Sequence, residues 1–194
     1  MIKAIVFDFF GVLSTEGFKL FRDTYFPNDE DKRRQAIQLV TKHDAGILSK
    51  AQYVAGLASL AAISEGIVER HMSSNAPNTL LIDYIKTELK PKYKIGLLSN
   101  AGDDYISQIL GPEDLSIFDD VVLSYQHSMV KPQKEIFDLA AKRLNILVSE
   151  CLFVDDSPSH CEGARRAGMT QLLYKDFPSF QKQIEAALSS SSDN

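Results

Sequence analysis

Short apolar runs occur at five places along the chain, and they predict the strands of a buried sheet. The runs are rich in β-branched and aliphatic residues, as strands covered on both faces are. They span residues 2–7, 94–98, 121–123, 151–154 and, with a weaker pattern, 170–174. Between the later runs, apolar residues recur at helical spacing over 78–89, 135–144 and 159–167. Strands that alternate with helices favour an α/β fold, a Rossmann-like parallel sheet with helices on both faces.

Residues 14–77 break this alternation because they contain no convincing strand. Their apolar pattern predicts helices over 18–25, 31–43, 50–61 and 65–72, which is too long a stretch for one crossover connection. We expect a small all-helical subdomain, residues 14–77, inserted into a core made of residues 1–13 and 78–188. The last residues, 189–194 (SSSSDN), are low in complexity, and we expect them to be disordered.

Composition and charge narrow the classes of function. The 194 residues suit one domain with a modest insertion, and the formal net charge of −5 argues against binding to nucleic acid or to an anionic membrane. The two cysteines, Cys151 and Cys161, are too few for a disulfide framework and suit a reducing cytoplasm. We find no signal peptide and no apolar run of about 18 residues, so we expect a cytoplasmic location without membrane attachment. The sequence predicts no oligomeric state.

Polar side chains follow the predicted strands at the edge where open parallel sheets bind ligands, beyond the carboxyl ends. In chain order they are Asp8, Ser99, Asn100, Lys131 (in the loop after the third strand), Asp155 and Asp156. Any one of them alone is typical of a turn or a helix cap. Together they bring carboxylates, a hydroxyl and an ammonium to one edge of the sheet, and this combination favours phosphoryl transfer.

Phosphoryl transfer gives these carboxylates a reason to gather. Neighbouring carboxylates repel one another and are costly to bury unless a cation neutralises them, and Mg²⁺ prefers carboxylates, waters and phosphate oxygens. We expect Asp8 to serve both as a metal ligand and as the nucleophile that forms an aspartyl-phosphate. We expect Ser99 and backbone N–H groups to hold phosphoryl oxygens, and Lys131 to neutralise the charge that builds up on them.

Four segments, FDFFGVL, LLSNA, MVKPQKEIF and LFVDDSPSHCEGARRAGM, resemble the four ordered motifs of the haloacid dehalogenase-like (HAD) hydrolase superfamily. The resemblance covers roughly residues 1–175. It implies a HAD-like core with the insertion as an all-helical cap of the C1 type, and relatives with such a cap act mostly on small molecules. Residues 44–58 (DAGILSKAQYVAGLA) also resemble a cap segment of a bacterial subgroup that includes sugar-phosphate phosphatases.

The resemblance assigns roles to the residues that handle phosphate. It implies that Asp8 is the nucleophile and a magnesium ligand, and that Lys131 steadies the phosphate and the nucleophile. Ser99 matches the phosphate-binding hydroxyl, with Asn100 beside it as a substrate-binding residue. The expected partner is therefore a small phosphorylated substrate, and the expected cofactor is Mg²⁺.

The metal motif carries one departure from the family pattern. Asp156 matches the carboxylate bound to Mg²⁺, and Asp155 matches its acidic neighbour, which often acts through water. Phe10 stands where many family phosphatases have a second aspartate, which protonates the leaving group and later activates water. Phenylalanine does neither, although its backbone carbonyl can ligate Mg²⁺ as that residue's carbonyl does in the family. Loss of a general acid–base typically costs about 10²–10⁴-fold in rate.

Three functions stay open at this point. A magnesium-dependent small-molecule phosphatase working through Asp8 ranks first. A catalytically weak or inactive relative that binds a phosphorylated ligand or a partner protein ranks second, because of Phe10. A 2-haloacid dehalogenase ranks third, since it needs no leaving-group acid but also no metal, whereas Asp155 and Asp156 resemble a metal site.

A phosphatase without the second aspartate needs good leaving groups or a proton donor from elsewhere. His127 lies close to Lys131 in the sequence and is one candidate donor, and His43 and Asp44 of the insertion are two more. We expect His160, at the start of a helix, to face solvent, with a place at the edge of the site, next to the metal motif, as the alternative.

Overall fold

The computed structural model describes residues 1–103 and 105–189, and within them all five strands form one parallel sheet. The strands are β1 (Ala4–Phe7), β2 (Lys94–Ser99), β3 (Asp120–Leu123), β4 (Cys151–Asp155) and β5 (Thr170–Leu173), in the spatial order β3-β2-β1-β4-β5. Each strand lies within two residues of its predicted range. The prediction of an α/β fold with a parallel sheet is therefore confirmed, and β1 is its central strand.

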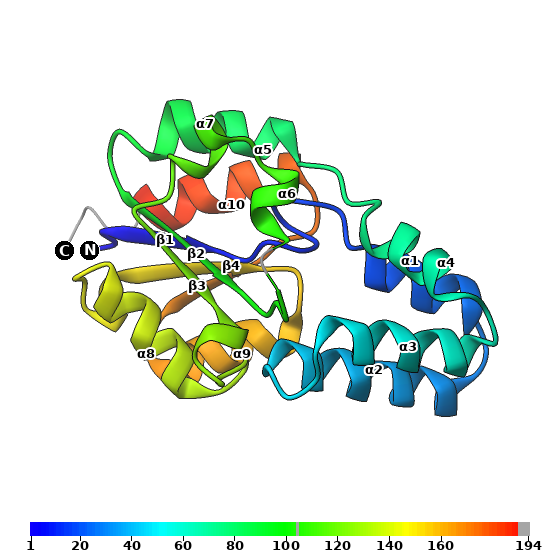
Figure 1. Ribbon diagram of the computed structural model, residues 1–194. Coiled ribbons are helices and arrows are strands. Elements are labelled where there is room, and N and C mark those ends of the chain that lie inside the picture. Colours follow the sequence, from blue (N-terminus) through cyan, green and yellow to red (C-terminus); the bar gives the residue numbers. More distant parts are fainter. Residues whose placement is uncertain (104, 190–194) are drawn as a thin grey trace.

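Helices cover both faces of this sheet (Figure 1). One layer holds α5 (Thr79–Tyr84) with its π-helical continuation η1 (Ile85–Leu89), α6 (Ile106–Ile109), α7 (Pro112–Leu115) and α10 (Phe177–Ser189). The other layer holds α8 (Lys134–Arg143) and α9 (Pro158–Ala167). Side chains of β1 alternate between them: Ile5 and Phe7 join one hydrophobic cluster, and Ala4 and Val6 join the other. Burial on both faces explains why the strand reads as a continuous apolar run.

Helix α10 is an element that the sequence analysis did not predict. Phe180 and Ile184, four residues apart, are fully buried against the sheet. The carboxylate of Asp176 accepts a hydrogen bond from the Ser179 N–H (2.8 Å) at the start of the helix. The predicted disordered tail is wrong at Ser189, which ends α10 and whose hydroxyl donates to the Glu185 carbonyl (2.8 Å). The remainder of that prediction, residues 190–194, lies outside the described residues.

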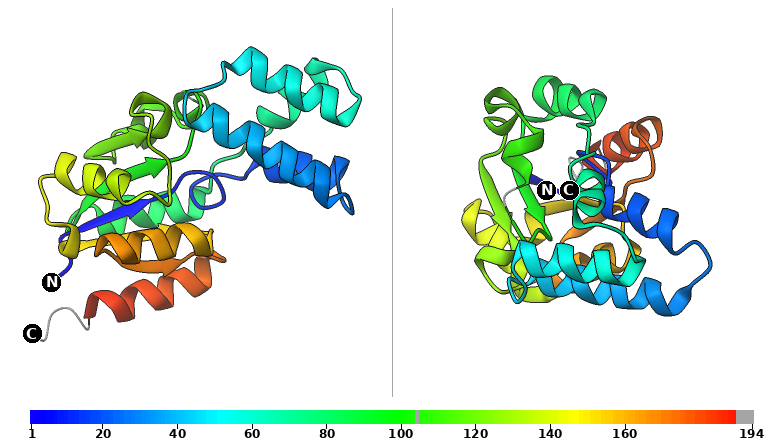
Figure 2. Two further views of the ribbon diagram at one scale, coloured as in Figure 1. Left: turned by 90° about the horizontal axis from the view of Figure 1, so that it is seen from below. Right: turned by 45° about the vertical axis from the view of Figure 1, so that its right-hand side comes forward.

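The stretch between β1 and α5 forms helices that lie beside the sheet rather than on it (Figures 1 and 2). They are α1 (Gly17–Tyr25), α2 (Glu30–Asp44), α3 (Lys50–Ala61) and α4 (Glu65–Met72), and we call them the helical insertion. Their bounds lie within one residue of the predicted ones. They have a hydrophobic cluster of their own, in which Phe21, Tyr53, Leu57 and Val68 are buried.

Two linkers join the helical insertion to the rest of the chain, and they lie side by side. The Thr15 N–H donates to the Ala76 carbonyl (3.0 Å), and the Ala76 N–H donates to the Thr15 hydroxyl (2.9 Å). Asn78 then fastens the returning linker, because its amide donates to the Val12 carbonyl (2.9 Å) and to the Tyr174 hydroxyl (2.8 Å). Entry to and exit from the insertion therefore occur at one place, next to the end of β1.

No single helix among the described residues has both the length and the apolar character that a membrane span requires. Helices α3 and α4 taken together satisfy that test of length and composition, but they are bent by 112° at the break between them.

Candidate active site

Asp8 is held rigidly just beyond the carboxyl end of β1. Its N–H extends the strand pairing by donating to the Val154 carbonyl (2.9 Å), and its Oδ1 accepts a hydrogen bond from the Phe9 N–H (2.7 Å). The chain then turns sharply at Gly11, whose φ of +85° lies in the left-handed region that favours glycine. A Cβ at Gly11 would stand 2.4 Å from Oδ2 of Asp156, so the turn also needs glycine for space. The turn thus brings the β1 and β4 loops together.

Lys131 connects two of the predicted carboxylates. Its Nζ lies 2.7 Å from Oδ1 of Asp8 and 2.6 Å from Oδ2 of Asp155, and the side chains of both Lys131 and Asp155 are fully buried. Burial would lower the pKa of the Lys131 ammonium, but the carboxylates of Asp155 and Asp8 outweigh it and raise that pKa. Lys131 is therefore charged, and it joins residues from three separate loops into one ion cluster.

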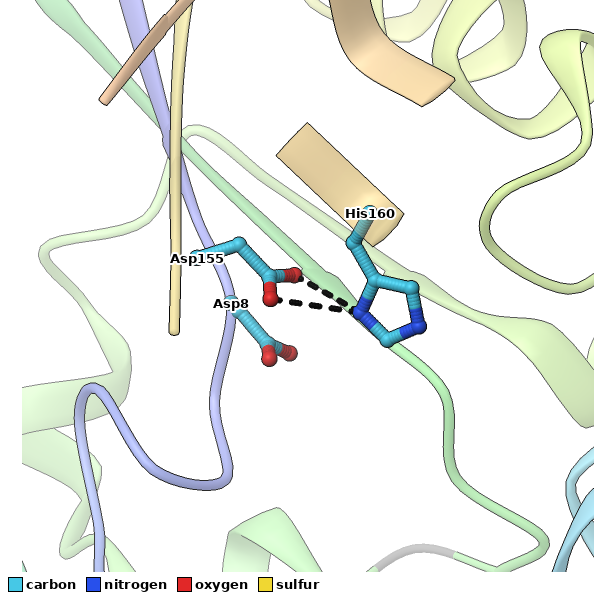
Figure 3. A group of neighbouring side chains, drawn as sticks. All are labelled: Asp8, Asp155 and His160. Carbon is cyan, nitrogen blue, oxygen red and sulfur yellow. Dashed lines mark hydrogen bonds and ion pairs between the residues drawn. The ribbon is translucent and has the colours of Figure 1, made fainter. Parts of the chain in front are cut away.

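The Asp155 carboxylate has more polar partners than any other carboxylate described at the site. Besides Lys131, its Oδ1 accepts a hydrogen bond from the Ser157 N–H (2.8 Å), and the Nδ1 atom of His160 lies 3.1–3.2 Å from its two oxygens (Figure 3). Burial alone would raise the pKa of Asp155, but Lys131 and His160 hold it well below its usual range. Of the two expectations for His160, the place at the edge of the site is the one observed, because the first turn of α9 aims its partly exposed ring at Asp155.

One ammonium faces two buried carboxyls, so ionising both of them would leave an excess of buried negative charge. Burial raises the pKa of Asp8 well above its usual range, and the Asp155 charge raises it further, against the opposing effect of Lys131. Burial and the Asp155 charge also raise the pKa of Asp156. A cation at this place would favour the ionised form of each of these carboxyls.

The donor atoms fit a small oxygen-liganded cation. Ligand atoms of Asp8, Asp155 and His160 all lie within 4.8 Å of one another (Figure 3). Within the described residues, Oδ2 of Asp8 receives no hydrogen bond, and the Asp156 carboxylate stands across the Gly11 turn. Since Asp155 and His160 are within hydrogen-bond distance of each other, Asp8 and Asp156 are the side chains best able to bind a metal directly. Carboxylate oxygens suit Mg²⁺ better than imidazole does.

Ser99 and Asn100 are neighbours in the sequence, but only Asn100 lines the pocket. The Ser99 hydroxyl is fully buried, has no hydrogen-bond partner among the described residues, and does not belong to the pocket lining. Asn100 lines the pocket, but its amide is used to hold the neighbouring loop. Its Oδ1 accepts from the Lys131 N–H (2.8 Å), and its Nδ2 donates to the Lys131 carbonyl (3.2 Å). Asn100 therefore positions Lys131, and its predicted contact with substrate stays a prediction.

A pocket of about 610 Å³ opens between this charged cluster and the helical insertion. Its sheet side carries Asp8, Lys131 and Asp156, and its insertion side mixes apolar side chains with charged and polar ones. The insertion contributes Glu16, Gly17, Phe18, Lys19, Arg22, Ile37, Val40, Thr41, His43, Asp44, Tyr53, Met72 and Asn75. Phe10 also lines the pocket, with its ring edge-on to Phe9 at 5.0 Å between centroids, so it adds apolar surface beside the nucleophile. The arrangement suits a small molecule with one strongly anionic end.

Two acidic residues outside the motifs line the same pocket. Burial and the Asp156 charge raise the pKa of Glu16, a residue that the sequence analysis did not single out and for which the sequence offers no signal. Burial raises the pKa of Asp44 to about 7, with Lys131 opposing and Glu16 adding to the rise. Asp44 is one of the candidate proton donors named from the sequence, and it lies in the pocket. His127, another candidate, is not part of the pocket lining.

Comparison with known proteins places this geometry in a family. A family model described as haloacid dehalogenase-like hydrolase matches residues 2–168. A D-ribitol-5-phosphate phosphatase of Bacteroides thetaiotaomicron is 28% identical over 219 aligned residues, covering 98% of this chain and 100% of that protein.

Solved structures agree with the sequence comparison. A HAD family enzyme from Bacteroides thetaiotaomicron, in complex with magnesium and inorganic phosphate, is 26% identical with a TM-score of 0.71, covering 90% of this chain and 95% of that one. A 2-haloacid dehalogenase from Pseudomonas syringae pv. tomato is 19% identical with a TM-score of 0.62, covering 91% and 90% of the two chains. The second likeness shows the fold alone.

Proposed function

Because the chain belongs to the haloacid dehalogenase-like hydrolase family, we propose that it is a magnesium-dependent phosphatase of small phosphorylated molecules. The ion cluster of Asp8, Lys131 and Asp155 is the observation that carries the proposal. It leaves Oδ2 of Asp8 without a hydrogen bond among the described residues, on the wall of a pocket large enough for a small phosphate ester. An oxygen in that position is suited to attack phosphorus.

In the proposed reaction, Asp8 is the nucleophile. Its carboxylate forms a bond to phosphorus while the bond from phosphorus to the leaving oxygen breaks, which gives an aspartyl-phosphate. Water then attacks phosphorus, so that phosphate leaves and the Asp8 carboxylate is restored. Lys131 holds Asp8 in place and neutralises negative charge on the phosphoryl group. The Ser99 hydroxyl is buried without a partner among the described residues, so it is free to donate, but it lies outside the pocket lining and its contact with a phosphoryl oxygen stays a prediction.

The proposed metal site consists of Asp8, Asp156 and the backbone carbonyl of Phe10, with Asp155 acting through water. When bound, Mg²⁺ would supply positive charge that stabilises the phosphoryl group during transfer. The excess of buried carboxylate around Lys131 supports this assignment, because such a cluster is unfavourable without a further cation.

We propose that residues 14–77 act as a cap of the C1 type over a core of residues 1–13 and 78–188. The position of the pocket between the helical insertion and the sheet edge supports this division. A cap excludes bulk water and contacts the part of the substrate that distinguishes it from other phosphates. The ribitol phosphate phosphatase among the relatives makes phosphorylated polyols and sugars the first class to test. The two unpaired cysteines suit a cytoplasmic enzyme.

Phe10 favours a second candidate function, a protein that binds a phosphorylated ligand with little or no turnover. The residue removes the carboxyl that many family phosphatases use for proton transfer and puts a phenyl ring in the pocket instead. Such a protein would retain binding of Mg²⁺ and phosphate.

Phosphate release measured with purified protein separates these candidates. The substrates are p-nitrophenyl phosphate and a panel of sugar and polyol phosphates, with Mg²⁺ or with EDTA. We expect turnover that needs Mg²⁺ and that Asp8→Asn abolishes. Asp29→Asn is the matched control, because it makes the same change at the exposed N-cap of α2, where asparagine caps equally well.

Each other outcome points elsewhere. Binding of Mg²⁺ and phosphate by calorimetry without release from any ester would support the binding protein. Release of halide from 2-haloacids without Mg²⁺ would support a dehalogenase and contradict the phosphatase.

A further inference from the structure

Phe10 leaves the proposed phosphatase without a proton donor for the leaving group, and the pocket contains a carboxyl that can fill this role. We propose that Asp44, the last residue of α2, is the general acid and base of the reaction. The inference rests on the proposed phosphatase function. It assigns the proton transfer to the helical insertion rather than to the β1 loop.

Asp44 is held against the sheet side of the pocket although it belongs to the insertion. The hydroxyl of Ser124 donates to the Asp44 carbonyl (2.5 Å) and accepts a hydrogen bond from the Ala101 N–H (2.9 Å). Ser124 follows β3 and Ala101 follows β2, so both partners stand at the edge that bears the ion cluster. The backbone of Asp44 is thereby fixed relative to Asp8.

The residue before Asp44 strengthens this attachment. The ring of His43 is stacked on Tyr53 of α3, with 4.6 Å between centroids, and its Nδ1 lies 3.0 Å from the Leu48 carbonyl. The same ring lies against Gly102, where a Cβ would approach it to 2.3 Å. Only glycine lets the end of α2 come this close to the loop after β2.

The surroundings of Asp44 suit a group that both gives and takes a proton. Lys131 favours its ionised form and Glu16 opposes it, while Tyr53 and Tyr105 face it with neutral hydroxyls. Its carboxylate receives no side-chain or backbone hydrogen bond within the described residues, so burial dominates and the pKa rises to about 7. General acids and bases work best with a pKa near the operating pH. A phosphate dianion in the pocket would favour the protonated form further.

Other candidates in the pocket are less suitable. Glu16 faces Asp156, on the side assigned to the metal. His43 has both nitrogens near partners, the Leu48 carbonyl and the Tyr105 hydroxyl, and is buried. The Nδ1 of His160 is engaged by Asp155, and His127 does not line the pocket.

Asp44 and water account for every proton that moves in the proposed reaction. As Asp8 attacks phosphorus and the ester P–O bond breaks, the Asp44 carboxyl gives its proton to the leaving oxygen, and an alcohol departs. The Asp44 carboxylate then takes a proton from the water that attacks the aspartyl-phosphate. Phosphate leaves, Asp8 regains its carboxylate, and Asp44 is protonated again.

The experiment compares leaving groups in wild type, Asp44→Asn and Glu16→Gln. An alkyl phosphate such as a polyol phosphate needs a proton on its leaving oxygen, whereas p-nitrophenolate departs as an anion. We expect Asp44→Asn to lower kcat/KM for the alkyl phosphate by about 10²–10⁴-fold and that for p-nitrophenyl phosphate by about tenfold or less. The variant should also lose the inflection near pH 7 in its rate profile, since that inflection belongs to Asp44.

Controls make the result specific. Asp29→Asn, at the other end of α2, should leave both substrates unaffected, and Asp44→Asn should unfold no more easily than wild type and bind Mg²⁺ as tightly at the pH of the assay. Equal losses with both substrates, or a leaving-group-dependent loss in Glu16→Gln instead, would overturn the proposal for Asp44. Wild type without turnover of any phosphate would instead refute the phosphatase function itself.

Discussion

At the scale of single residues, Lys131 sets the charge balance of the candidate site. It is buried with two carboxylates within 2.7 Å, and no other lysine or arginine of the described chain forms an ion pair with Asp8 or Asp155. Such a cluster holds its members in place because each charge would be costly to leave without the others. The same arrangement makes the protein sensitive to removal of the ammonium.

We predict that Lys131→Met destabilises the protein by about 3–5 kcal/mol, because it leaves buried carboxylates without a partner. Urea denaturation at pH 8 without Mg²⁺ measures the change. Lys134→Met is the matched control. It removes an exposed ion pair with Asp138 on the next helix, where a loss of about 0–1 kcal/mol is expected. A loss for Lys131→Met no larger than that of the control would contradict the view that the ion cluster stabilises the fold.

The raised pKa of Asp44 has a consequence for stability. Its carboxyl has a pKa of about 7 in the folded protein against an ordinary value of 3.8, so the unfolded chain ionises first as the pH rises. Folding is therefore progressively disfavoured between about pH 4 and pH 7. We predict that Asp44→Asn has the same thermal stability as wild type at pH 4 and a higher one at pH 8. A difference that stays constant over this range, as expected for Asp29→Asn, would show that Asp44 titrates normally.

At the scale of elements, the contact between the end of α2 and the loop after β2 attaches the helical insertion to the edge of the sheet. Gly102 lies under the His43 ring so closely that a Cβ would approach it to 2.3 Å. The contact therefore depends on the absence of a side chain at Gly102 as much as on His43 of the insertion.

We predict that Gly102→Ala displaces the end of α2 and lowers kcat for alkyl phosphates, while the sheet stays folded. Alanine at Gly111, on the same side of the sheet with nothing within 4 Å of the added Cβ, should have no such effect. Steady-state kinetics and near-ultraviolet circular dichroism measure the two consequences. Unchanged kinetics in Gly102→Ala would mean that the end of α2 does not take part in the reaction.

Sequence patterns predicted the elements whose signals are local. Strands such as β1 were recognisable because burial on both faces makes them uniformly apolar, and α3 because its apolar residues recur at helical spacing. The convergence of Asp8, Lys131 and Asp155 was predictable because parallel strands end at one edge.

The features that the sequence did not predict depend on contacts between elements far apart in the chain. The pairing of His160 with Asp155 follows from the way α9 leaves β4, and the place of Asp44 in the pocket follows from how α2 meets Ser124. Helix α10 was missed although Phe180 and Ile184 have helical spacing, and one such pair is a weak signal.

At the scale of the whole molecule, the protein has two separately packed parts. The sheet is buried by two hydrophobic clusters, one on each face, and the helical insertion has a third that shares no buried residue with them. Parts with separate cores open with different free energies.

We predict that native-state hydrogen exchange divides the amides in the same way. Amides of β1 and β4 should exchange only through global unfolding, whereas those of α2 and α3 should exchange through a less costly opening of the insertion. Mg²⁺ with inorganic phosphate should slow exchange at the end of α2 more than at its beginning. Equal protection in both parts would contradict independent opening.

The side-by-side linkers have a consequence for how this protein can change over time. Because Thr15 and Ala76 are hydrogen-bonded neighbours, everything between them can be lengthened, shortened or replaced without altering the path of the chain through the sheet. An evolutionary descendant could acquire a new substrate specificity by exchanging the segment between Thr15 and Ala76, while Asp8, Lys131 and Asp155 stay unchanged. If Asp44 supplies the proton, that freedom has a limit, since any replacement segment must bring an acid of its own.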